Sequence, residues 1–510
     1  MGNVVVIGGG IGGLTAAAYA AHAGHSVTLF ESQPGPGGKA LSLQQAGYRF
    51  DTGPSVFTMQ DVFATVFSEL DQDFSSLLSP VPLDPGFCYW WPDGSTLRLS
   101  PGEEALLAGA EQLGIPRAQT AAYIASCRKI YHATHELFLW RSLHSLSTYR
   151  TRVFWRSLMQ IGRIKALRSM HAVNARFFSD SRMQQFADRY ATYNGSSPYR
   201  TPATMNIISY VENILGAMSL DGGTVQLPLA LEKTARKLGV DLRYSSPVDE
   251  IMTVPHKRTW FGLGRTRHRV TGVRSGGRIY PADVVISNAD VEPTYKYLLQ
   301  DPAAPELKRY LNQEPSSSVI VWYLGIAARF SQLSVNNIFF SGDYHREFSQ
   351  IFDGKLPDDP TLYLNITSKV TPQDAPPYGE NWFVLVNTPP DNGQDWDSLA
   401  TRVYDHIIQR MSAELGQDIT PLIEFAEPLT PRDIQTRTGS RQGSIYGIAS
   451  NTRTAAFSRH PNRSRRYAGL YFCGGSVHPG GGMPMVVLSG RIAASLIAQD
   501  FHRGRLGNYH

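Results

Sequence analysis

Near its start the chain reads NVVVIGGGIGGLTAAAYAAHAG, residues 3–24, and this stretch decides the fold. Residues 3–7 are a short apolar run rich in valine, which predicts a buried strand. Residues 14–23 are rich in alanine, which predicts a helix that Gly24 ends. The spacing GxGxxG between strand and helix is met by Gly8, Gly10 and Gly13. The order of strand, glycine-rich turn and helix indicates a phosphate-binding unit.

Each glycine of this turn has a physical role. Gly8 permits the tight turn, Gly10 lets the backbone approach a pyrophosphate, and Gly13 lets helix and strand pack closely. The helix N-terminus favours the anion. A second strand over residues 26–30 ends in Glu31, at the spacing of roughly 20 residues expected for a carboxylate that binds a ribose. The turn is therefore predicted to bind a dinucleotide.

Length and composition limit the class of protein. At 510 residues the chain is too long for one ordinary core, so we expect two packed domains. Hydrophobic residues at 42% and charged residues at 18% are typical of a globular protein. The three cysteines form no CxxC pair, so we expect neither a disulfide framework nor a zinc site, and a reducing cytoplasm fits. The sequence indicates neither a transmembrane helix nor a signal peptide.

A second glycine-rich loop follows the second strand. It contains Gly37, Gly38 and Lys39, and residues 48–55 then read YRFDTGPS. Two such loops suit a cofactor that is bound over its whole length. A GG pair with a basic residue, followed by DxG, recurs in this order in the flavin-dependent amine oxidase and carotenoid desaturase superfamily, which the sequence resembles here.

The C-terminal part carries the same resemblance. Residues 471–491 read YFCGGSVHPGGGMPMVVLSGR, a strand, a glycine-rich loop and a helix start. In FAD enzymes of this superfamily the corresponding segment closes over the flavin ring, and a segment like Pro247-Val248 contacts the adenine end. The resemblance implies FAD rather than NAD. The expected cofactor-binding residues are Gly8, Gly10, Gly13, Glu31, Gly38, Lys39, Asp51, Gly53, Val248, Gly475, Gly482, Met483 and Met485.

The resemblance also implies the architecture. We expect an α/β protein with a Rossmann-like FAD-binding domain that is discontinuous in sequence. Its three parts are expected at residues 1–80, 216–299 and 436–510. The insertions at 81–215 and 300–435 are expected to form a mixed α+β substrate domain, and the first insertion is expected to include a helical membrane-contact region.

One stretch of the first insertion is strongly basic. From Trp140 to Arg168 it contains no Asp or Glu, and its aromatic residues include Tyr149 and Trp155. Phe154, Leu158 and Ile161 fall on one helical face. Its cations are Arg141, Arg150, Arg152, Arg156, Arg163, Lys165 and Arg168. The pattern predicts a segment in the headgroup region of an anionic membrane; a basic helix packed on the core is the alternative. Nucleic-acid binding is not expected from one such segment.

Further motifs narrow the resemblance to bacterial carotenoid desaturases, which are phytoene desaturase-like. Residues 193–203 include the SPY element at 197–199. Residues 475–484 look closest to the branch that desaturates hydroxylated carotenoids at C-3,4, because VHPG and PMV stand where the phytoene desaturase branch carries THPG and PGV. The implied activity is C-3,4 desaturation of a 1-hydroxylated acyclic carotenoid. Phytoene desaturase, carotenoid isomerase, amine oxidase and a non-enzymatic prenyl-lipid carrier stay open as alternatives.

The sequence offers few acid–base candidates. No catalytic triad, HExxH motif or metal-ligand cluster is present, so no metal is expected. His478 is the one candidate base, and a positioning role is equally open to it. Hydride transfer from an allylic C–C bond to flavin needs orientation and an apolar tunnel more than acid–base groups. We expect a hydrophobic carotenoid as substrate, a quinone or oxygen as electron acceptor, and a cytoplasmic protein bound peripherally to the inner face of the cell membrane.

Overall fold

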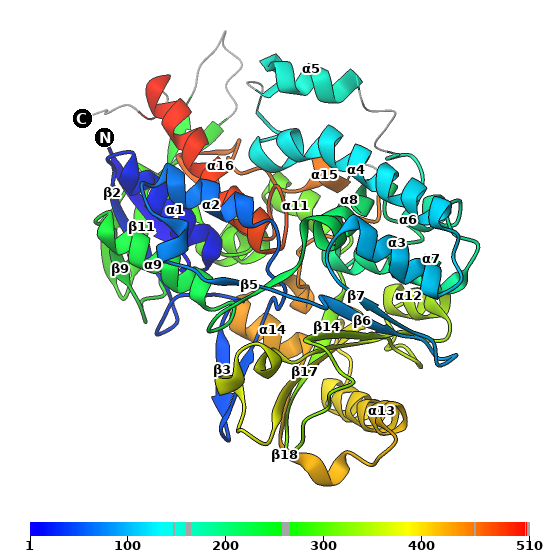
Figure 1. The fold of residues 1–510 in the computed structure, drawn as a ribbon. Helices are drawn as coiled ribbons and strands as arrows, with labels where there is room; N and C mark the ends of the chain where they lie inside the picture. The colour runs from blue at the N-terminus through cyan, green and yellow to red at the C-terminus, as the bar shows by residue number, and fades with distance from the viewer. Residues whose placement is uncertain (146–147, 160–164, 258–265, 453–454, 505, 507–510) are drawn as a thin grey trace.

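The computed structural model describes residues 1–145, 148–159, 165–257, 266–452, 455–504 and 506 (Figure 1). A five-stranded sheet has the order β20-β13-β1-β2-β9, and every pairing in it is parallel. Its strands are β1 (Asn3–Ile7), β2 (Ser26–Phe30), β9 (Asp241–Arg243), β13 (Val284–Ser287) and β20 (Leu470–Phe472). Segments from the beginning, middle and end of the chain thus form one sheet, which confirms the predicted α/β fold with a discontinuous nucleotide-binding sheet.

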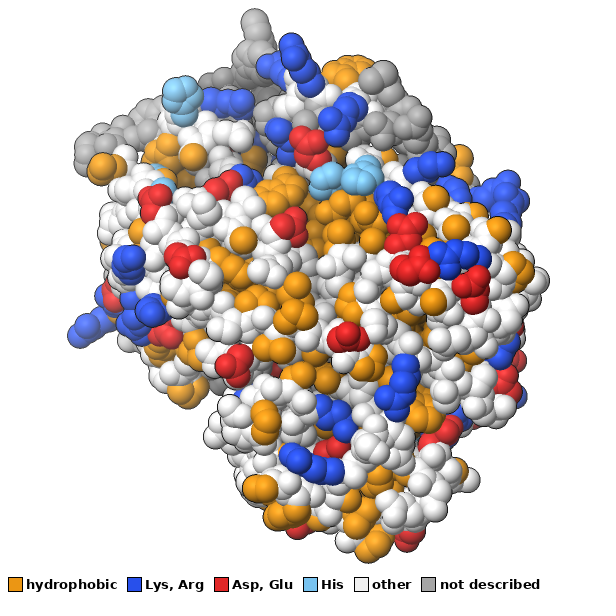
Figure 2. All heavy atoms as spheres, in the orientation of Figure 1, with side chains coloured by type: hydrophobic (Ala, Val, Ile, Leu, Met, Phe, Trp, Pro, Cys, Tyr) orange, Lys and Arg blue, Asp and Glu red, His pale blue; other side chains and the backbone are white. Residues whose placement is uncertain are grey.

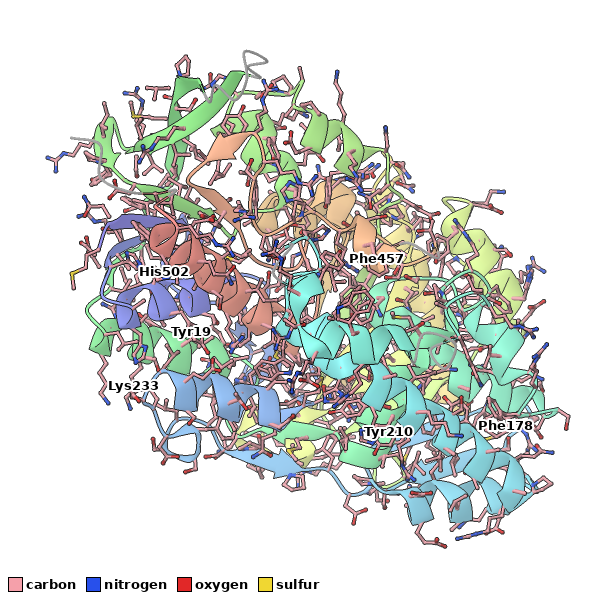
Figure 3. The ribbon with its side chains drawn as sticks, turned by 90° about the horizontal axis from the view of Figure 1, so that it is seen from above. Tyr19, Phe178, Tyr210, Lys233, Phe457 and His502 are labelled. Carbon is pink, nitrogen blue, oxygen red and sulfur yellow. The ribbon has the colours of Figure 1, made fainter. Side chains whose placement is uncertain are left out.

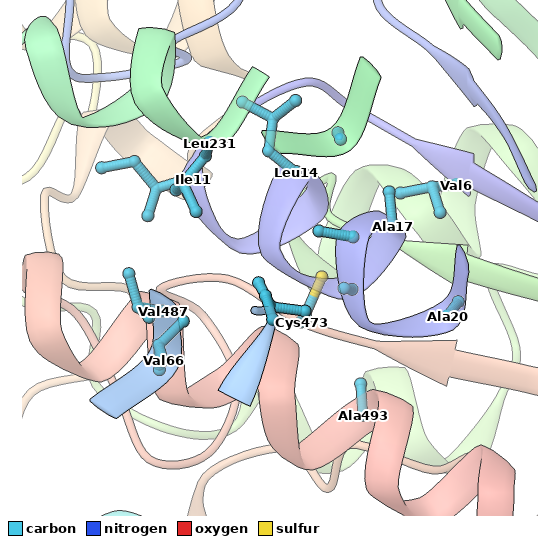
Figure 4. Packing of buried hydrophobic residues seen from close by; sticks show 14 of the residues in the cluster. Val6, Ile11, Leu14, Ala17, Ala20, Val66, Leu231, Cys473, Val487 and Ala493 are labelled. Atoms are coloured by element: carbon cyan, nitrogen blue, oxygen red, sulfur yellow. The ribbon is translucent and has the colours of Figure 1, made fainter. Parts of the chain in front are cut away.

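Both faces of this sheet are covered. Val4 and Val6 of β1 belong to a core with α1 (Ile11–His22), α2 (Gln60–Glu69), α9 (Gln226–Lys237) and α16 (Met483–His502), part of which Figure 4 shows. Val5 and Ile7 face a second core with β10 (Val248–Lys257), β11 (Thr266–Ser275), β12 (Arg278–Pro281) and α11 (Pro305–Leu311). A strand buried on both sides needs a continuous apolar run, and residues 4–7 supply it.

The first helix begins three residues earlier than the composition indicates. Helix α1 starts at Ile11, so Gly12 and Gly13 lie in its first turn. The reason is packing: a Cβ atom on Gly13 would lie 2.0 Å from the carbonyl oxygen of Gly8. Glycine therefore allows the helix to start directly against the end of β1.

A second, mainly antiparallel sheet of seven strands has the order β18-β14-β17-β16-β15-β6-β7. Its strands are β6 (Phe87–Trp90), β7 (Thr96–Leu99), β14 (Ser318–Ile326), β15 (Asn336–Phe339), β16 (Leu362–Asn365), β17 (Glu380–Thr388) and β18 (Ile423–Leu429). Helix α13 (Trp396–Leu415) packs on it through Trp396, Val403 and Ile407. The sheet combines strands from both predicted insertions, because β6 pairs in parallel with β15.

Helices and an aromatic core lie against strands β6 and β7 of the second sheet. These helices are α3 (Glu103–Gln112), α4 (Arg117–Trp140), α7 (Ser181–Asp188), α8 (Ile207–Tyr210) and α12 (Tyr344–Phe352). Helix α6 (Met170–Asn174) packs beside α7. We call this core the aromatic core; it is defined by Phe87, Tyr89, Trp91, Phe186 and Phe340 with their apolar neighbours. Seen from above, Tyr210 and Phe178 lie on the side away from Tyr19 of α1 and His502 of α16 (Figure 3).

Smaller elements complete the fold. Helix α5 (Arg152–Met159) lies at the top of the molecule, beyond α4 (Figure 1). The remaining helices and strands are α10 (Val291–Pro293), α14 (Pro431–Thr438), α15 (Ala455–Ser458), β3 (Ser42–Gln45), β4 (Tyr48–Asp51), β5 (Pro80–Pro82), β8 (Met218–Leu220) and β19 (Tyr467–Ala468). Within the described residues, no helix combines the length and the apolar character that crossing a membrane requires.

Candidate flavin site

The glycine-rich turn lies at the carboxyl edge of the parallel sheet, where ligands of such folds bind. Gly8 has a φ of 97°, a conformation that glycine adopts without strain, and its N–H donates to the carbonyl of Phe30 at 2.7 Å. The N-terminus of α1 follows immediately, with Gly10 as its N-cap. The N–H groups of the first turn of α1 and the helix dipole at this point suit a pyrophosphate.

Glu31 directly follows β2, beside this turn. Its side chain is buried, and its Oε2 accepts a hydrogen bond from the Gly9 N–H at 2.6 Å. Its Oε1 accepts from the Gln33 N–H at 2.8 Å, so the carboxylate is fixed next to the turn. The Ser246 N–H donates to the Glu31 carbonyl at 2.8 Å, which brings the segment before Val248 to the same place. The predicted ribose-binding and adenine-side residues are therefore neighbours.

The second loop contacts the first one. The Gly37 N–H donates to the Gly9 carbonyl at 3.0 Å. A Cβ atom on Gly38 would lie 3.2 Å from the Cα of Gly10, so the two backbones are in close contact. Lys39 is half-buried, and among the described residues it has no ion-pair partner. A cation in this position is suited to a phosphate group.

Asp51 and Gly53 connect this loop to the body of the protein. A Cβ atom on Gly53 would lie 1.9 Å from the Lys39 carbonyl oxygen. Asp51 accepts hydrogen bonds from Arg49 Nη2 at 2.6 Å and from the Thr224 N–H at 3.1 Å. Burial raises the pKa of Asp51, while Arg49 acts in the opposite direction. Asp51 thus has protein partners, which join the loop to residues 222–224.

The C-terminal loop and α16 close the site from the other side. A Cβ atom on Gly12 would lie 3.0 Å from the Gly474 nitrogen and 3.1 Å from Val486. Gly482 is the N-cap of α16, which places Met483 and Met485 in its first turn, and Gly475 lies close to Gly481. The structure therefore brings the first turn of α1 and the C-terminal loop together.

Asn288 is a site residue that the sequence did not single out. It follows β13, and its Nδ2 donates to the Gly8 carbonyl at 3.4 Å. Its Oδ1 accepts from the thiol of Cys473 at 3.5 Å. A Cβ atom on Gly10 or Gly12 would lie within 2.9 Å of its amide. Asn288 therefore joins three segments, and the only signal in the sequence was an amide directly after a buried strand.

His478 is buried in the C-terminal loop. Its Nε2 donates to the carbonyl of Arg141 at 2.8 Å when the proton is placed on that nitrogen, and its Nδ1 is buried with no hydrogen-bond partner among the described residues. Burial lowers its pKa to about 3. An imidazole with this pKa is a weak base near neutral pH. The contacts favour the positioning role, because they attach the C-terminal loop to the end of α4.

The buried histidines predict a pH dependence of stability. Burial lowers the pKa of both His460 and His478 to about 3. Each imidazole takes up a proton near pH 6.5 in the unfolded chain, but only near pH 3 in the folded chain. The contribution of the two neutral imidazoles to the free energy of unfolding is therefore complete above about pH 6.5 and is lost toward pH 3. We expect His478→Gln to reduce this dependence by about 1.4 kcal/mol per pH unit, measured by denaturant unfolding at several pH values.

The exposed His502 supplies the control for this measurement. His502→Gln replaces an exposed histidine and is measured in the same way. An identical pH dependence in wild type and His478→Gln would contradict the assignment of a neutral, buried imidazole at position 478.

The sheet and its edge define the class of protein: an α/β protein with a dinucleotide site. A family model described as flavin containing amine oxidoreductase matches residues 11–498. The chain belongs to this family. It is an FAD-dependent oxidoreductase, as predicted, and the glycine cradle, Glu31 and Lys39 fit the diphosphate and ribose of FAD. Those residue assignments themselves stay predictions.

Individual relatives cover nearly the whole chain. The chain is 39% identical over 502 residues to a 1-hydroxycarotenoid 3,4-desaturase of Flavobacterium sp. (strain P99-3). The alignment covers 98% of this chain and 99% of the relative. It is 33% identical over 513 residues to a 4,4'-diapolycopene oxygenase of Methylomonas sp., with 98% of each covered. The crystal structure of an oxidoreductase from Methanosarcina mazei has a TM-score of 0.63 at 17% identity, covering 97% of this chain and 100% of the other. The predicted resemblance to carotenoid desaturases is confirmed.

Proposed function

We propose that the protein is a carotenoid desaturase that introduces C=C bonds into an acyclic carotenoid. For the finer assignment we propose C-3,4 desaturation of a 1-hydroxylated carotenoid. The observation that carries this proposal is the 39% identity, over 98% of the chain, with a relative named for this activity. The desaturase-like motifs at 197–199 and 475–484 support it from the sequence.

The described residues suit such a reaction. FAD, when bound, supplies the acceptor for the hydride that leaves an allylic carbon. The chain supplies an apolar environment: the aromatic core packs against Met485 and Leu488 of α16, next to the C-terminal loop of the flavin site. Tyr89 and Trp91 stack on Phe340 with ring centroids 6.2 and 5.4 Å away. These buried rings exclude water from the core beside the site.

A second candidate function is oxidation of the carotenoid end. It is favoured by one observation, the 33% identity with a relative named 4,4'-diapolycopene oxygenase. The two reactions differ in their products, because desaturation removes two hydrogens whereas an oxygenase adds oxygen. Mass spectrometry of the product separates them.

Pigment analysis tests the main proposal. The protein is expressed in cells that make acyclic carotenoids with and without a 1-hydroxyl group, and the pigments are separated by chromatography with absorption spectra. We expect a longer-wavelength product, with one further conjugated double bond, from the 1-hydroxylated carotenoid. Conversion of colourless phytoene would instead indicate a phytoene desaturase, and rearranged products without loss of hydrogen would indicate an isomerase.

We also propose that the protein binds the inner face of the cell membrane through the segment around α5. Lys and Arg side chains gather at the top of the molecule over α5 (Figure 2). Trp155 is 58% exposed, and Leu167 is 73% exposed. Lys165 is not a free cation that faces the membrane. Its Nζ donates to the Ser126 hydroxyl and lies 4.7 Å from the ring centroid of Phe177. Of the predicted segment, Ile161 and Arg163 lie outside the described residues.

Charge removal tests the membrane contact. We expect the triple variant Arg150→Gln, Arg152→Gln and Arg156→Gln to bind anionic vesicles on the order of 100-fold more weakly, because each arginine near the surface contributes about 1 kcal/mol. The measurement is co-sedimentation with phosphatidylserine-containing vesicles. The control triple variant replaces Arg346, Arg402 and Arg432, exposed arginines whose ion-pair partners are aspartates. Equal binding by both variants would contradict this surface. We also propose that a quinone or oxygen accepts the electrons from the reduced flavin.

A further inference from the structure

An ion pair lies in the aromatic core. Arg189 begins the 3₁₀ segment η4 (Arg189–Asn194), and Glu212 lies in the π-helical segment η6 (Val211–Leu215). Arg189 Nη2 donates to Glu212 Oε1. The side chains are only 5% and 1% exposed, and no other ion pair among the described residues has both partners below one tenth. We call Arg189, Glu212 and their phenol neighbours the buried polar cluster.

Phenol and phenyl rings surround the pair. The guanidinium of Arg189 lies 4.7 Å from the ring centroid of Phe87 and 4.4 Å from that of Tyr190. Arg189 Nη2 also donates to the Tyr89 hydroxyl at 2.9 Å. Tyr193 donates to Glu212 Oε2, and Tyr190 donates to Glu212 Oε1 at 3.1 Å. The cluster thus combines three tyrosines with two opposite charges.

Packing alone does not explain the buried ion pair of Arg189 and Glu212. Removing two ions from water costs several kcal/mol each, and an apolar pair of the same volume often stabilises a core as well. The cluster is also incomplete, because Arg189 Nε is buried and donates to no described group. A π-helical segment at Glu212 is a further sign, since such segments occur frequently at functional sites. These features together favour a ligand.

The cluster is connected to the flavin site. The N–H of Met218, six residues after Glu212, donates to the carbonyl of Phe57 at 2.8 Å, and the N–H of Phe57 donates to the carbonyl of Met218 at 2.9 Å. Phe57 lies four residues after Gly53 of the second flavin loop. A cavity of about 10 Å³, the space of one water-sized polar group, is lined by Glu212, Asn213 and Phe87 but not by Arg189. The polar cluster is therefore at the junction between the aromatic core and the first flavin loops.

We propose that Arg189 and Glu212 are specificity-determining residues that bind a hydroxyl group at the end of an otherwise apolar polyene. The inference rests on the proposed function and names the part of the substrate that this cluster recognises. A hydroxyl oxygen can accept from Arg189 Nε and its proton can be donated to the carboxylate, whereas a hydrocarbon end can do neither. In a 1-hydroxylated chain only one carbon separates C-1 from the C-3,4 bond, so an anchor for this hydroxyl must lie beside the flavin.

The test compares two acyclic carotenoids with the same polyene, one with and one without a 1-hydroxyl group. We expect wild type to prefer the hydroxylated chain by about 10- to 100-fold in kcat/KM, the usual effect of a hydrogen bond to a charged group. In the double variant Arg189→Met/Glu212→Leu, the preference should fall to within about threefold of equality, through a higher KM for the hydroxylated chain.

Flavin content separates binding specificity from folding. A flavin-loaded double variant that keeps the wild-type preference overturns the assignment and leaves a structural pair. If the double variant does not bind flavin, Tyr193→Phe carries the test, since it removes one hydroxyl from Glu212 and should lower the preference about 3- to 10-fold. An unchanged preference in folded Tyr193→Phe also overturns the assignment. A flavin-loaded wild type that converts neither chain overturns the proposed function itself, and this inference with it.

Discussion

Gly13→Val is expected to abolish FAD binding and to destabilise the fold. A Cβ atom at this position would lie 2.0 Å from the Gly8 carbonyl oxygen and 3.1 Å from the side chain of Asn288. The first contact is with backbone, so α1 has to move away from β1. We expect this to lower the free energy of unfolding by several kcal/mol, near the upper end of the range for overpacked cores. The N–H groups at the start of α1 would then leave the pyrophosphate position. The measurement is flavin absorbance relative to protein, together with the melting temperature.

Gly35→Ala is the matched control, because it lies in the neighbouring loop but has open space. A Cβ atom on Gly35 meets nothing within 4 Å, and Gly35 is not among the glycines with positive φ. We expect this variant to bind FAD as wild type does. Stoichiometric flavin in Gly13→Val would show that α1 does not start against β1 as described.

Glu212→Leu is expected to be the most destabilising change in the aromatic core. It leaves Arg189 charged and unpaired among Phe87, Tyr190 and Tyr193, which costs about 3–5 kcal/mol for a buried pair with one partner removed. The double variant Arg189→Met/Glu212→Leu should recover most of this loss, since it removes both charges and keeps apolar volume. Denaturant unfolding of the flavin-loaded proteins measures both values.

An exposed ion pair provides the comparison. Arg346 and Asp358 are 66% and 55% exposed, and their atoms are 2.7 Å apart. We expect Arg346→Ala to cost less than about 1 kcal/mol, because water screens an exposed pair. If Glu212→Leu costs no more than Arg346→Ala, the two charges are not buried together.

Much of the flavin site could be predicted from the sequence. The strand over residues 3–7, the glycine spacing and Glu31 lie within one stretch of about 30 residues, and each reflects a local backbone requirement. The structure places Glu31 against Gly9 and the second loop against the first. The start of α1 was predicted too late, since alanine content marks the helix interior and gives no weight to glycines in its first turn.

Other residues could not be found in this way. Asn288 meets Gly8 across 280 residues of sequence, and His478 meets Arg141 across 337. Arg189 and Glu212 are 23 residues apart, but their pairing depends on an irregular path through 3₁₀ and π-helical turns. No spacing rule for a regular helix or strand predicts that they face each other.

The sequence by itself determined the nucleotide-binding unit, because glycine spacing and buried strands are constraints that neighbouring residues impose on the backbone. Its resemblance to the carotenoid desaturase superfamily implied the discontinuous sheet and FAD. Only the tertiary structure decided which polar groups are partners: Asn288 with the glycine turn, His478 with the end of α4, and Arg189 with Glu212. Such partnerships depend on how distant segments pack and on how deeply the packing removes each charge from water.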